Sequence, residues 1–143
     1  MARDALYGHV IVCGYGTVGQ KVIEIIMGKN LPFVVVENDP KKISHLNELG
    51  YRAVEGDATS SNTLKKAGIE SAKAIAISMD DDAKNLFAVL AARDLNRGIF
   101  IAARANDDFV REKLIEAGAD HIVMPNRAAS REIVNEILKG NSK

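Results

Sequence analysis

The sequence has little cysteine and no tryptophan, and its charges leave no excess of either sign. Its single cysteine, Cys13, excludes an internal disulfide and, without another thiol nearby, gives no support for a zinc site. The 19 basic residues balance the 19 acidic ones, and no segment concentrates Lys or Arg. A nucleic-acid partner is therefore not expected, because the electrostatic footprint of such a protein is missing.

Long apolar stretches are also missing. No run approaches the roughly 18 to 20 apolar residues that a membrane span requires, and residues 1–8 lack the apolar segment of a signal peptide. The lone thiol suits a reducing cytosol. Apolar residues make up 47% of the 143 residues and charged residues 27%, which is enough to build one globular domain.

Short apolar runs alternate along the chain with segments of helical spacing. Such runs, followed by glycine or a polar residue, are typical of strands buried on both faces of a parallel sheet. Asp39 and Pro40 supply an N-cap and a favoured first helical residue. The expected strands cover residues 9–13, 33–36 (ending at Glu37), 52–55, 74–77, 99–103 and 121–124. The expected helices are one carrying Val18 to Ile26, then 40–49, 60–67, 80–95, 107–117 and 128–139.

Six strands that alternate with helices predict an α/β fold with a doubly wound, Rossmann-like parallel sheet. Parallel neighbours need crossover connections, and right-handed crossovers place helices on both faces of the sheet. The expected strand order is 3-2-1-4-5-6. In such sheets ligands bind at the carboxyl ends of the strands, so the residues that follow each strand are the candidates for a site.

The residues after the first strand, Gly14-Tyr15-Gly16-Thr17-Val18-Gly19, match the pattern G-x-G-x-x-G. In a dinucleotide site the first glycine makes a tight turn, the second admits a pyrophosphate and the third lets helix and strand pack closely. The amides at the helix N-terminus would then face the phosphates. Glycines also mark ordinary turns, which is the alternative. A Walker P-loop is excluded because Gln20-Lys21 follow Gly19.

Glu37 ends the second strand about twenty residues beyond the glycines, where an acid accepts hydrogen bonds from ribose hydroxyls. It would also repel a 2′-phosphate, and with Asn38 and Asp39 following it NADP is disfavoured. The alternative is a strand that simply ends in water. Asp57 is predicted either to contact the adenosine or to cap the next helix. Ser78 and Arg104 follow two further strands, and an arginine there suits phosphate.

Three other groups have simpler explanations than chemistry. The run Asp80-Asp81-Asp82 at a helix start favours capping over a metal site. His9, His45 and His121 show no spacing for a shared metal, so each is predicted to be structural. Cys13, beside the glycine turn, is predicted to be a small core residue, since no basic neighbour in the sequence would activate it.

Several motifs in order resemble the RCK domain family, also called KTN or TrkA-N. These are residues 9–19, Glu37-Asn38-Asp39, Gly56-Asp57-Ala58-Thr59, residues 64–68 and residues 117–120. The resemblance covers about His9 to Lys139. It implies a regulator of potassium flux in which the 14–19 loop and Arg104 hold phosphates, Glu37 the ribose and Asp57 the adenosine side. Asn38, Ala58 and Ser78 are further candidate cofactor-binding residues.

The resemblance also implies an architecture. Residues 1–8 would be a linker, 9–139 the N-terminal RCK (Rossmann) domain and 140–143 a tail, with the smaller C-terminal lobe absent from this chain. Family members form homodimers that assemble into rings, here expected to be octameric, at the inner face of the cell membrane beside a channel pore or a transporter subunit. Ser78, Arg104 and Asn106 stand where some calcium-gated relatives have carboxylates, so calcium gating through that site is not expected.

The helices over 80–95 and 128–139 carry apolar residues that suit either sheet packing or subunit contacts. The competing function is the NAD-binding half of a dehydrogenase, but the sequence holds no Tyr-x-x-x-Lys pair. The expected protein is therefore not an enzyme. Its expected ligand is NAD or NADH, with ATP, ADP or AMP as the alternative, and it would gate a potassium channel or regulate a Trk/Ktr-type transporter.

Overall fold

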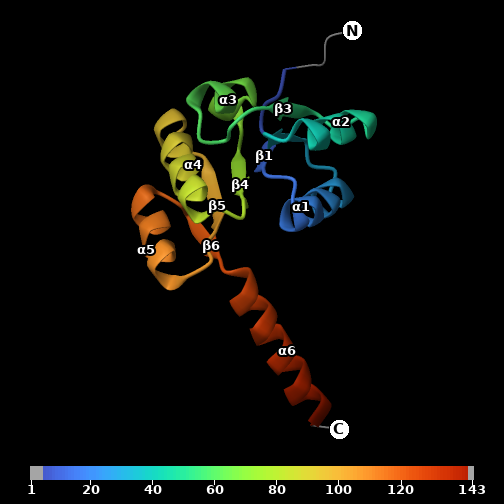
Figure 1. Ribbon diagram of the computed structural model, residues 1–143, viewed down its shortest axis with the longest axis vertical. Coiled ribbons are helices and arrows are strands. Elements are labelled where there is room, and N and C mark those ends of the chain that lie inside the picture. The colour runs from blue at the N-terminus through green and yellow to red at the C-terminus, as the bar shows by residue number, and fades with distance from the viewer. Residues whose placement is uncertain (1–4, 142–143) are drawn as a thin grey trace.

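The computed structural model describes residues 5–141, and its core is a six-stranded, all-parallel sheet (Figure 1). The order β3-β2-β1-β4-β5-β6 confirms the predicted doubly wound fold. The strands are β1 (Val10–Cys13), β2 (Phe33–Glu37), β3 (Ala53–Glu55), β4 (Ala74–Ile77), β5 (Phe100–Arg104) and β6 (His121–Val123).

A helix connects each strand to the next as a crossover, and a further helix follows the last strand. The helices are α1 (Thr17–Gly28), α2 (Pro40–Glu48), α3 (Ser61–Lys66), α4 (Asp82–Leu95), α5 (Asp108–Ala117) and α6 (Pro125–Asn141), with a 3₁₀ turn, η1, at Ile69–Ser71. The turn was not predicted, because three residues are too short to show a period. No helix in the described part of the chain combines the length and apolarity needed to cross a bilayer.

Two apolar cores lie on opposite faces of the sheet. One contains Ile11 and Ile75 and is covered by α3, α4 and α5, whereas the other contains Val12 and Val35 and is covered by α1 and α2. Strand β1 has neighbours on both sides, pairing with β2 and with β4. Because helices also cover both faces of the sheet, β1 is buried along its whole length and its residues are all apolar.

The predicted helix ends are confirmed where a side chain or a turn defines them. The Asp39 carboxylate accepts a hydrogen bond from the Lys41 amide at 2.9 Å, and Pro40 is the first residue of α2. Asp81 caps α4 by accepting from the Lys84 amide at 3.1 Å. Glycines with positive φ angles follow the other ends of helices, at positions 50, 68 and 118.

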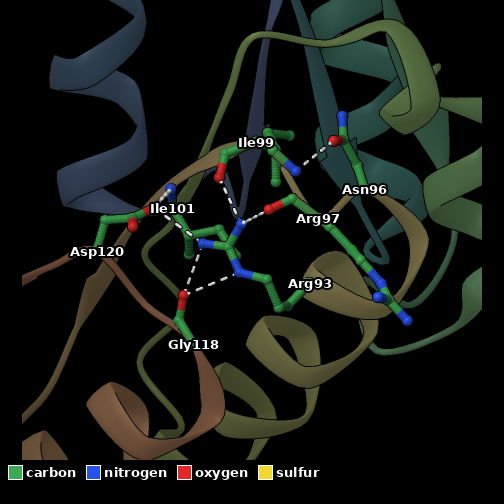
Figure 2. Close-up of polar contacts among 8 residues, drawn as sticks. Arg93, Asn96, Arg97, Ile99, Ile101, Gly118 and Asp120 are labelled. Carbon is green, nitrogen blue, oxygen red and sulfur yellow. Dashed lines mark hydrogen bonds and ion pairs between the residues drawn. The ribbon is translucent and has the colours of Figure 1, made fainter.

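The arginine at position 93 joins three elements at the edge of the sheet where the strands begin (Figure 2). All five of its N–H groups are used: they reach the carbonyl oxygens of Gly118, Arg97 and Ile99 and the Asp120 carboxylate, at 2.7 to 3.1 Å. Asp120 in turn accepts from the Ile101 amide at 2.8 Å. The end of α4, the start of β5 and the α5–β6 turn are thereby held together.

The last helix differs from the prediction in its start and in its surroundings. It begins at Pro125 rather than at residue 128, because proline has the backbone angle of a first helical turn and lacks only an amide that would be unpaired there. It also continues to Asn141, through the start of the predicted tail, whose last two residues lie outside the described part. Helix α6 projects away from the sheet, and its side chains from 126 to 140 are exposed (Figure 1).

Candidate nucleotide-binding cleft

A cleft of about 590 Å³ opens at the carboxyl ends of the strands. It lies over β1 and β4, where the strand order reverses and where open α/β sheets bind ligands. Of the twelve residues predicted to bind a nucleotide, only Gly19 lies off its wall. The eleven that line it are Gly14, Tyr15, Gly16, Thr17, Val18, Glu37, Asn38, Asp57, Ala58, Ser78 and Arg104.

The glycine turn has the shape that its sequence pattern predicts. Gly14 has φ +98°, a conformation that other residues rarely adopt, and its amide donates to the Val36 carbonyl at 2.9 Å. A Cβ at Gly19 would overlap the carbonyl oxygen of Gly14, so the third glycine serves close packing beneath the cleft. A Cβ at Gly16 would meet no atom within 4 Å, because that position faces open space.

Backbone amides at the start of α1 are free to bind an anion. The first hydrogen bond of the helix runs from the Gln20 amide to the Gly16 carbonyl at 2.9 Å. Among the described residues, the N–H groups from Gly16 to Gly19 find no acceptor. The first four amides of a helix lack partners within it, and they favour negative charge. Three of these four residues line the cleft.

Glu37 holds the glycine turn against the end of β2. Its Oε1 accepts from the Tyr15 amide at 3.0 Å, and its Oε2 accepts from the Asp39 amide at 2.7 Å. The alternative of a strand that merely ends in water is therefore wrong. Each carboxylate oxygen still has a second lone pair, so ribose hydroxyls can donate to Glu37 without displacing either amide.

Asp57 forms a local turn rather than a helix cap. Its Oδ1 accepts from the Thr59 amide at 2.9 Å and from the Thr59 hydroxyl at 2.7 Å, whereas the N-cap of α3 is Ser60. The capping alternative for Asp57 is wrong. The hydrogen bonds from Thr59, the backbone one first, outweigh desolvation and lower the pKa of the Asp57 carboxyl, with a smaller contribution from Lys84. Asp57 is therefore a charged group at the wall of the cleft.

The far wall is built from the ends of β4 and β5. The Ser78 hydroxyl lies 3.4 Å from the Cys13 carbonyl, and Met79 follows against the glycine turn. The Arg104 guanidinium donates to Asn106 Oδ1 from Nε at 3.3 Å and from Nη2 at 3.2 Å. From the sequence, Asn106 was considered only as a position of the calcium site of some relatives. In the structure it orients Arg104, the arginine that was predicted to bind phosphate.

Eight residues of the wall escaped the sequence pattern. Lys42, Lys84, Pro125 and Asn126 lie in helices, so reasoning from strand ends could not find them. The other four are neighbours of predicted residues: Val36, Gly56, Met79 and Asp80. The wall therefore carries three cationic side chains, two of them unpredicted, and three acidic ones.

Cys13 and His9 lie in the interior of the fold. Cys13 is fully buried, and burial raises the pKa of its thiol to about 12. The ring of His9 is buried, with Nε2 2.8 Å from the Ala67 carbonyl oxygen, and none of the three histidines lines the cleft. Within residues 5–141, no cluster of three or more His, Cys, Asp or Glu side chains is placed to hold a metal ion.

A shallower and larger groove, of about 850 Å³, lies at the opposite edge of the sheet. It is lined by residues before β1 and by the approaches to β2 and β3, among them Tyr7, Phe33 and Tyr51. This edge carries the amino ends of the strands, away from the glycine turn. The smaller cleft is the candidate site because it combines helix amides, a ribose-type acid and an arginine.

Comparison with known proteins identifies relatives of this chain. The family model described as the TrkA-N domain matches residues 10–125. Potassium channel protein 1 of Methanocaldococcus jannaschii is 40% identical over 130 residues, which make up 90% of this chain and 39% of the channel protein. The chain therefore spans about two fifths of the length of that relative.

Solved structures agree with the fold. The TrkA-N domain of the inner membrane protein YbaL from Escherichia coli has a TM-score of 0.88 at 30% identity, covering 92% of this chain and 98% of that one. The GsuK channel bound to NAD has a TM-score of 0.77 at 26% identity, covering 87% and 22%. GsuK bound to ADP has the same TM-score at 27% identity, covering 86% and 32%.

Proposed function

The chain belongs to the TrkA-N (RCK) domain family, and we propose that it is a ligand-sensing regulatory domain. It binds an adenine nucleotide or dinucleotide in the cleft over β1 and β4. Binding gates potassium flux through an associated membrane channel or, as the alternative partner, through a Trk/Ktr-type transporter.

The observation that carries this proposal is the set of unpaired amides at the start of α1. They face a cleft whose nearer end holds the Glu37 carboxylate and whose farther end holds the Arg104 guanidinium. The amides would bind an anion, the Glu37 carboxylate would accept from hydroxyl groups, and the Arg104 guanidinium would bind further negative charge. A ribose attached to phosphates has all three features.

The ligand we favour is NAD or NADH, with ATP, ADP or AMP as alternatives. Glu37 on β2 and Arg104 on β5 are three strand spacings apart, about 14 Å along the sheet. That span suits a molecule longer than a nucleoside. The GsuK channel has been solved with both NAD and ADP, which supports one cleft accepting either class. The Glu37 carboxylate disfavours a 2′-phosphate and hence NADP.

The proposed partner is the membrane-spanning part of a channel or transporter, with the domain at the inner face of the cell membrane. Similarity to a potassium channel protein and to a domain of an inner membrane protein supports this. We place homodimers, assembled into a ring, beneath that partner. The exposed apolar side chains of α4 and α6, among them Phe87 and Ile137, would then lie in subunit contacts.

Catalysis is not part of the proposal. The relatives that match this chain include a potassium channel protein and a domain of an inner membrane protein, which supports a regulatory role. A ligand acts here by binding more tightly to one arrangement of the ring than to another, and its differential affinity sets how far the equilibrium moves.

The test is calorimetric titration of the domain with NAD, NADH, ATP, ADP and AMP. We expect saturable binding of at least one, without turnover, and weaker binding by the Glu37→Ala variant. Glu55→Ala is the matched control, because Glu55 pairs with Glu37 in the sheet register but is absent from the cleft wall. If none of the five ligands binds, the glycine turn is only structural and the proposal fails.

A further inference from the structure

We propose that Asn85, which does not line the cleft, is a positioning residue that sets the wall presented to the ligand's outer phosphate. The inference rests on the proposed function, because it assigns a role within the same nucleotide site. It concerns how Arg104 and Met79 are held, which neither the glycine pattern nor the spacing of strand ends reveals.

Asn85 lies in the first turns of α4 and is fully buried. Its Oδ1 accepts from the Met79 amide at 3.1 Å. Its Nδ2 donates to the Met79 carbonyl at 2.8 Å and to the Arg104 carbonyl at 3.1 Å. One side chain thus ties the loop after β4 to the carboxyl end of β5, with both donors and the acceptor occupied.

Both residues that Asn85 holds are part of the cleft wall. Met79 also lies against the glycine turn, where a Cβ added to Gly14 would come within 3.3 Å of its Cγ. Fixing the Met79 backbone therefore fixes the surface beside the phosphate-binding turn. Fixing the Arg104 carbonyl determines where its long side chain leaves the sheet.

A second asparagine holds the other end of Arg104. Asn106 Oδ1 receives the Nε and Nη2 hydrogen bonds of the guanidinium, while the Asn106 amide and Nδ2 donate to Asp82 Oδ1 at 3.2 and 2.9 Å. Asp82 and Asn85 belong to the same end of α4, so this helix end governs the backbone and the head group of Arg104. Among the described residues, Nη1 has no partner, which leaves it free for phosphate.

A purely structural role for Asn85 predicts a different result from a positioning role. Loss of structural hydrogen bonds lowers the stability of the fold and weakens all ligands alike. Loss of positioning weakens the ligand whose outer phosphate reaches Arg104 and spares one that stops at the glycine turn. AMP and ADP differ by that one phosphate.

The test compares Asn85→Asp with Asn96→Asp. Asn96 lies just beyond the other end of α4 and has a similar set of partners: Nδ2 donates to the Ile69 and Ala72 carbonyls, and Oδ1 accepts from the Gly98 amide. A carboxylate at either position keeps the acceptor and loses both donors. Both variants should therefore lose stability, more at the fully buried Asn85 than at the half-buried Asn96, but only the change at Asn85 should alter the cleft.

We expect Asn85→Asp to lower the affinity for ADP by about tenfold or more while the affinity for AMP falls less than about threefold. Asn96→Asp should leave the ratio of the two affinities unchanged. An equal loss for AMP and ADP, or an unchanged ADP affinity in folded Asn85→Asp, overturns the inference. If Asn85→Asp does not fold, the Asn106→Ala variant is measured instead, because Asn106 is exposed. The same comparison of ADP affinity with AMP affinity then tests the inference.

Nuclear magnetic resonance of the ligand-free protein separates this inference from the proposed function. If the wild-type domain binds no nucleotide, the proposed function fails. The signals of the Met79 amide and the Arg104 Nε–H still report how the cleft wall is arranged. Shifts of both signals in Asn85→Asp, with the Arg104 signal also moving in Asn106→Ala and neither moving in Asn96→Asp, support the positioning role. Unmoved signals overturn it.

Discussion

Two glycines of the same turn have opposite surroundings. Gly16 faces open space with φ −91°, a value open to any residue, whereas Gly19 is packed against the carbonyl of Gly14. Gly16→Ala should therefore keep the thermal midpoint within about 2 °C but lower nucleotide affinity about tenfold or more, because a methyl group keeps phosphate from the amides. Calorimetry and thermal melting would measure both quantities.

Gly19→Ala is the companion variant. Its methyl group must displace the Gly14 carbonyl, so we expect a loss of stability of about 2 kcal/mol or more as well as weaker binding. If Gly16→Ala bound nucleotides as tightly as the wild type, the turn would not be a phosphate site.

The thiol of Cys13 makes a pH-dependent contribution to stability. Burial raises its pKa from 9.0 to about 12, so the folded protein keeps a proton that the unfolded chain releases above pH 9. The free energy of unfolding should then fall by about 1.4 kcal/mol per pH unit between the two values.

Urea unfolding at pH 8, 9 and 10, with Cys13→Ala as reference, isolates this effect from that of the tyrosines and lysines. The free energy of unfolding of the wild type should fall relative to that of Cys13→Ala as the pH rises. A difference that is constant with pH would mean that the thiol ionises as readily in the fold as in the unfolded chain.

At the scale of elements, Arg93 joins α4, β5 and the α5–β6 turn (Figure 2). Arg93→Met keeps much of the packing but leaves three carbonyl groups and Asp120 without these donors. We expect a loss of about 3 kcal/mol in the free energy of unfolding, measured in urea.

Asp120→Asn is the control for the ion pair alone. The asparagine oxygen can still accept from the Ile101 amide, and the other hydrogen bonds of Arg93 remain. The loss should be below about 1 kcal/mol, as for a partly exposed ion pair. Equal losses in the two variants would mean that the ion pair with Asp120, rather than the hydrogen bonds of Arg93 to carbonyl groups, provides the stability.

The elements themselves could be predicted from local patterns. Apolar runs located all six strands to within a residue or two, and the Asp39-Pro40 pair located the start of α2. The contacts that join elements could not be predicted in this way. Asn85 meets Arg104 and Arg93 meets Gly118 across 19 and 25 residues, and neither distance has a period or a motif.

At the scale of the whole molecule, α6 presents Ile133, Val134, Ile137 and Leu138 on an exposed face, each more than half accessible. An isolated helix of this length is only marginally stable in water, so a partner surface would be expected to stabilise it. We expect the wild type to form dimers and the double variant Ile133→Glu, Ile137→Glu to be monomeric in sedimentation velocity. Its thermal midpoint should stay within about 2 °C of the wild type at a concentration where both are monomers.

The control carries Glu132→Gln and Glu136→Gln, which change the same turns without touching the apolar face. It should sediment like the wild type. A double glutamate variant with the wild-type sedimentation coefficient would show that dimers, if present, form through another surface such as the exposed side of α4.

Sequence patterns located the whole-molecule topology and most of the cleft, because both follow from the order of strands and from what stands at their carboxyl ends. They missed the helix-borne residues of the wall, Lys42, Lys84 and Asn126, since a helix reaches the cleft only through the packing of the complete fold. The close packing that the pattern predicts for Gly19 is present, since a Cβ there would meet the Gly14 carbonyl beneath the turn.

The pairing of β1 with both β2 and β4 has a consequence for synthesis. Val10 pairs with Phe33 on one side, but its partner on the other side, Ala74, comes 64 residues later than Val10. At ribosomal speeds of roughly 5 to 20 residues per second, one edge of this apolar strand waits about 3 to 13 s for β4. During that interval the nascent chain exposes an apolar strand with one unpaired edge, which is the kind of surface that chaperones bind.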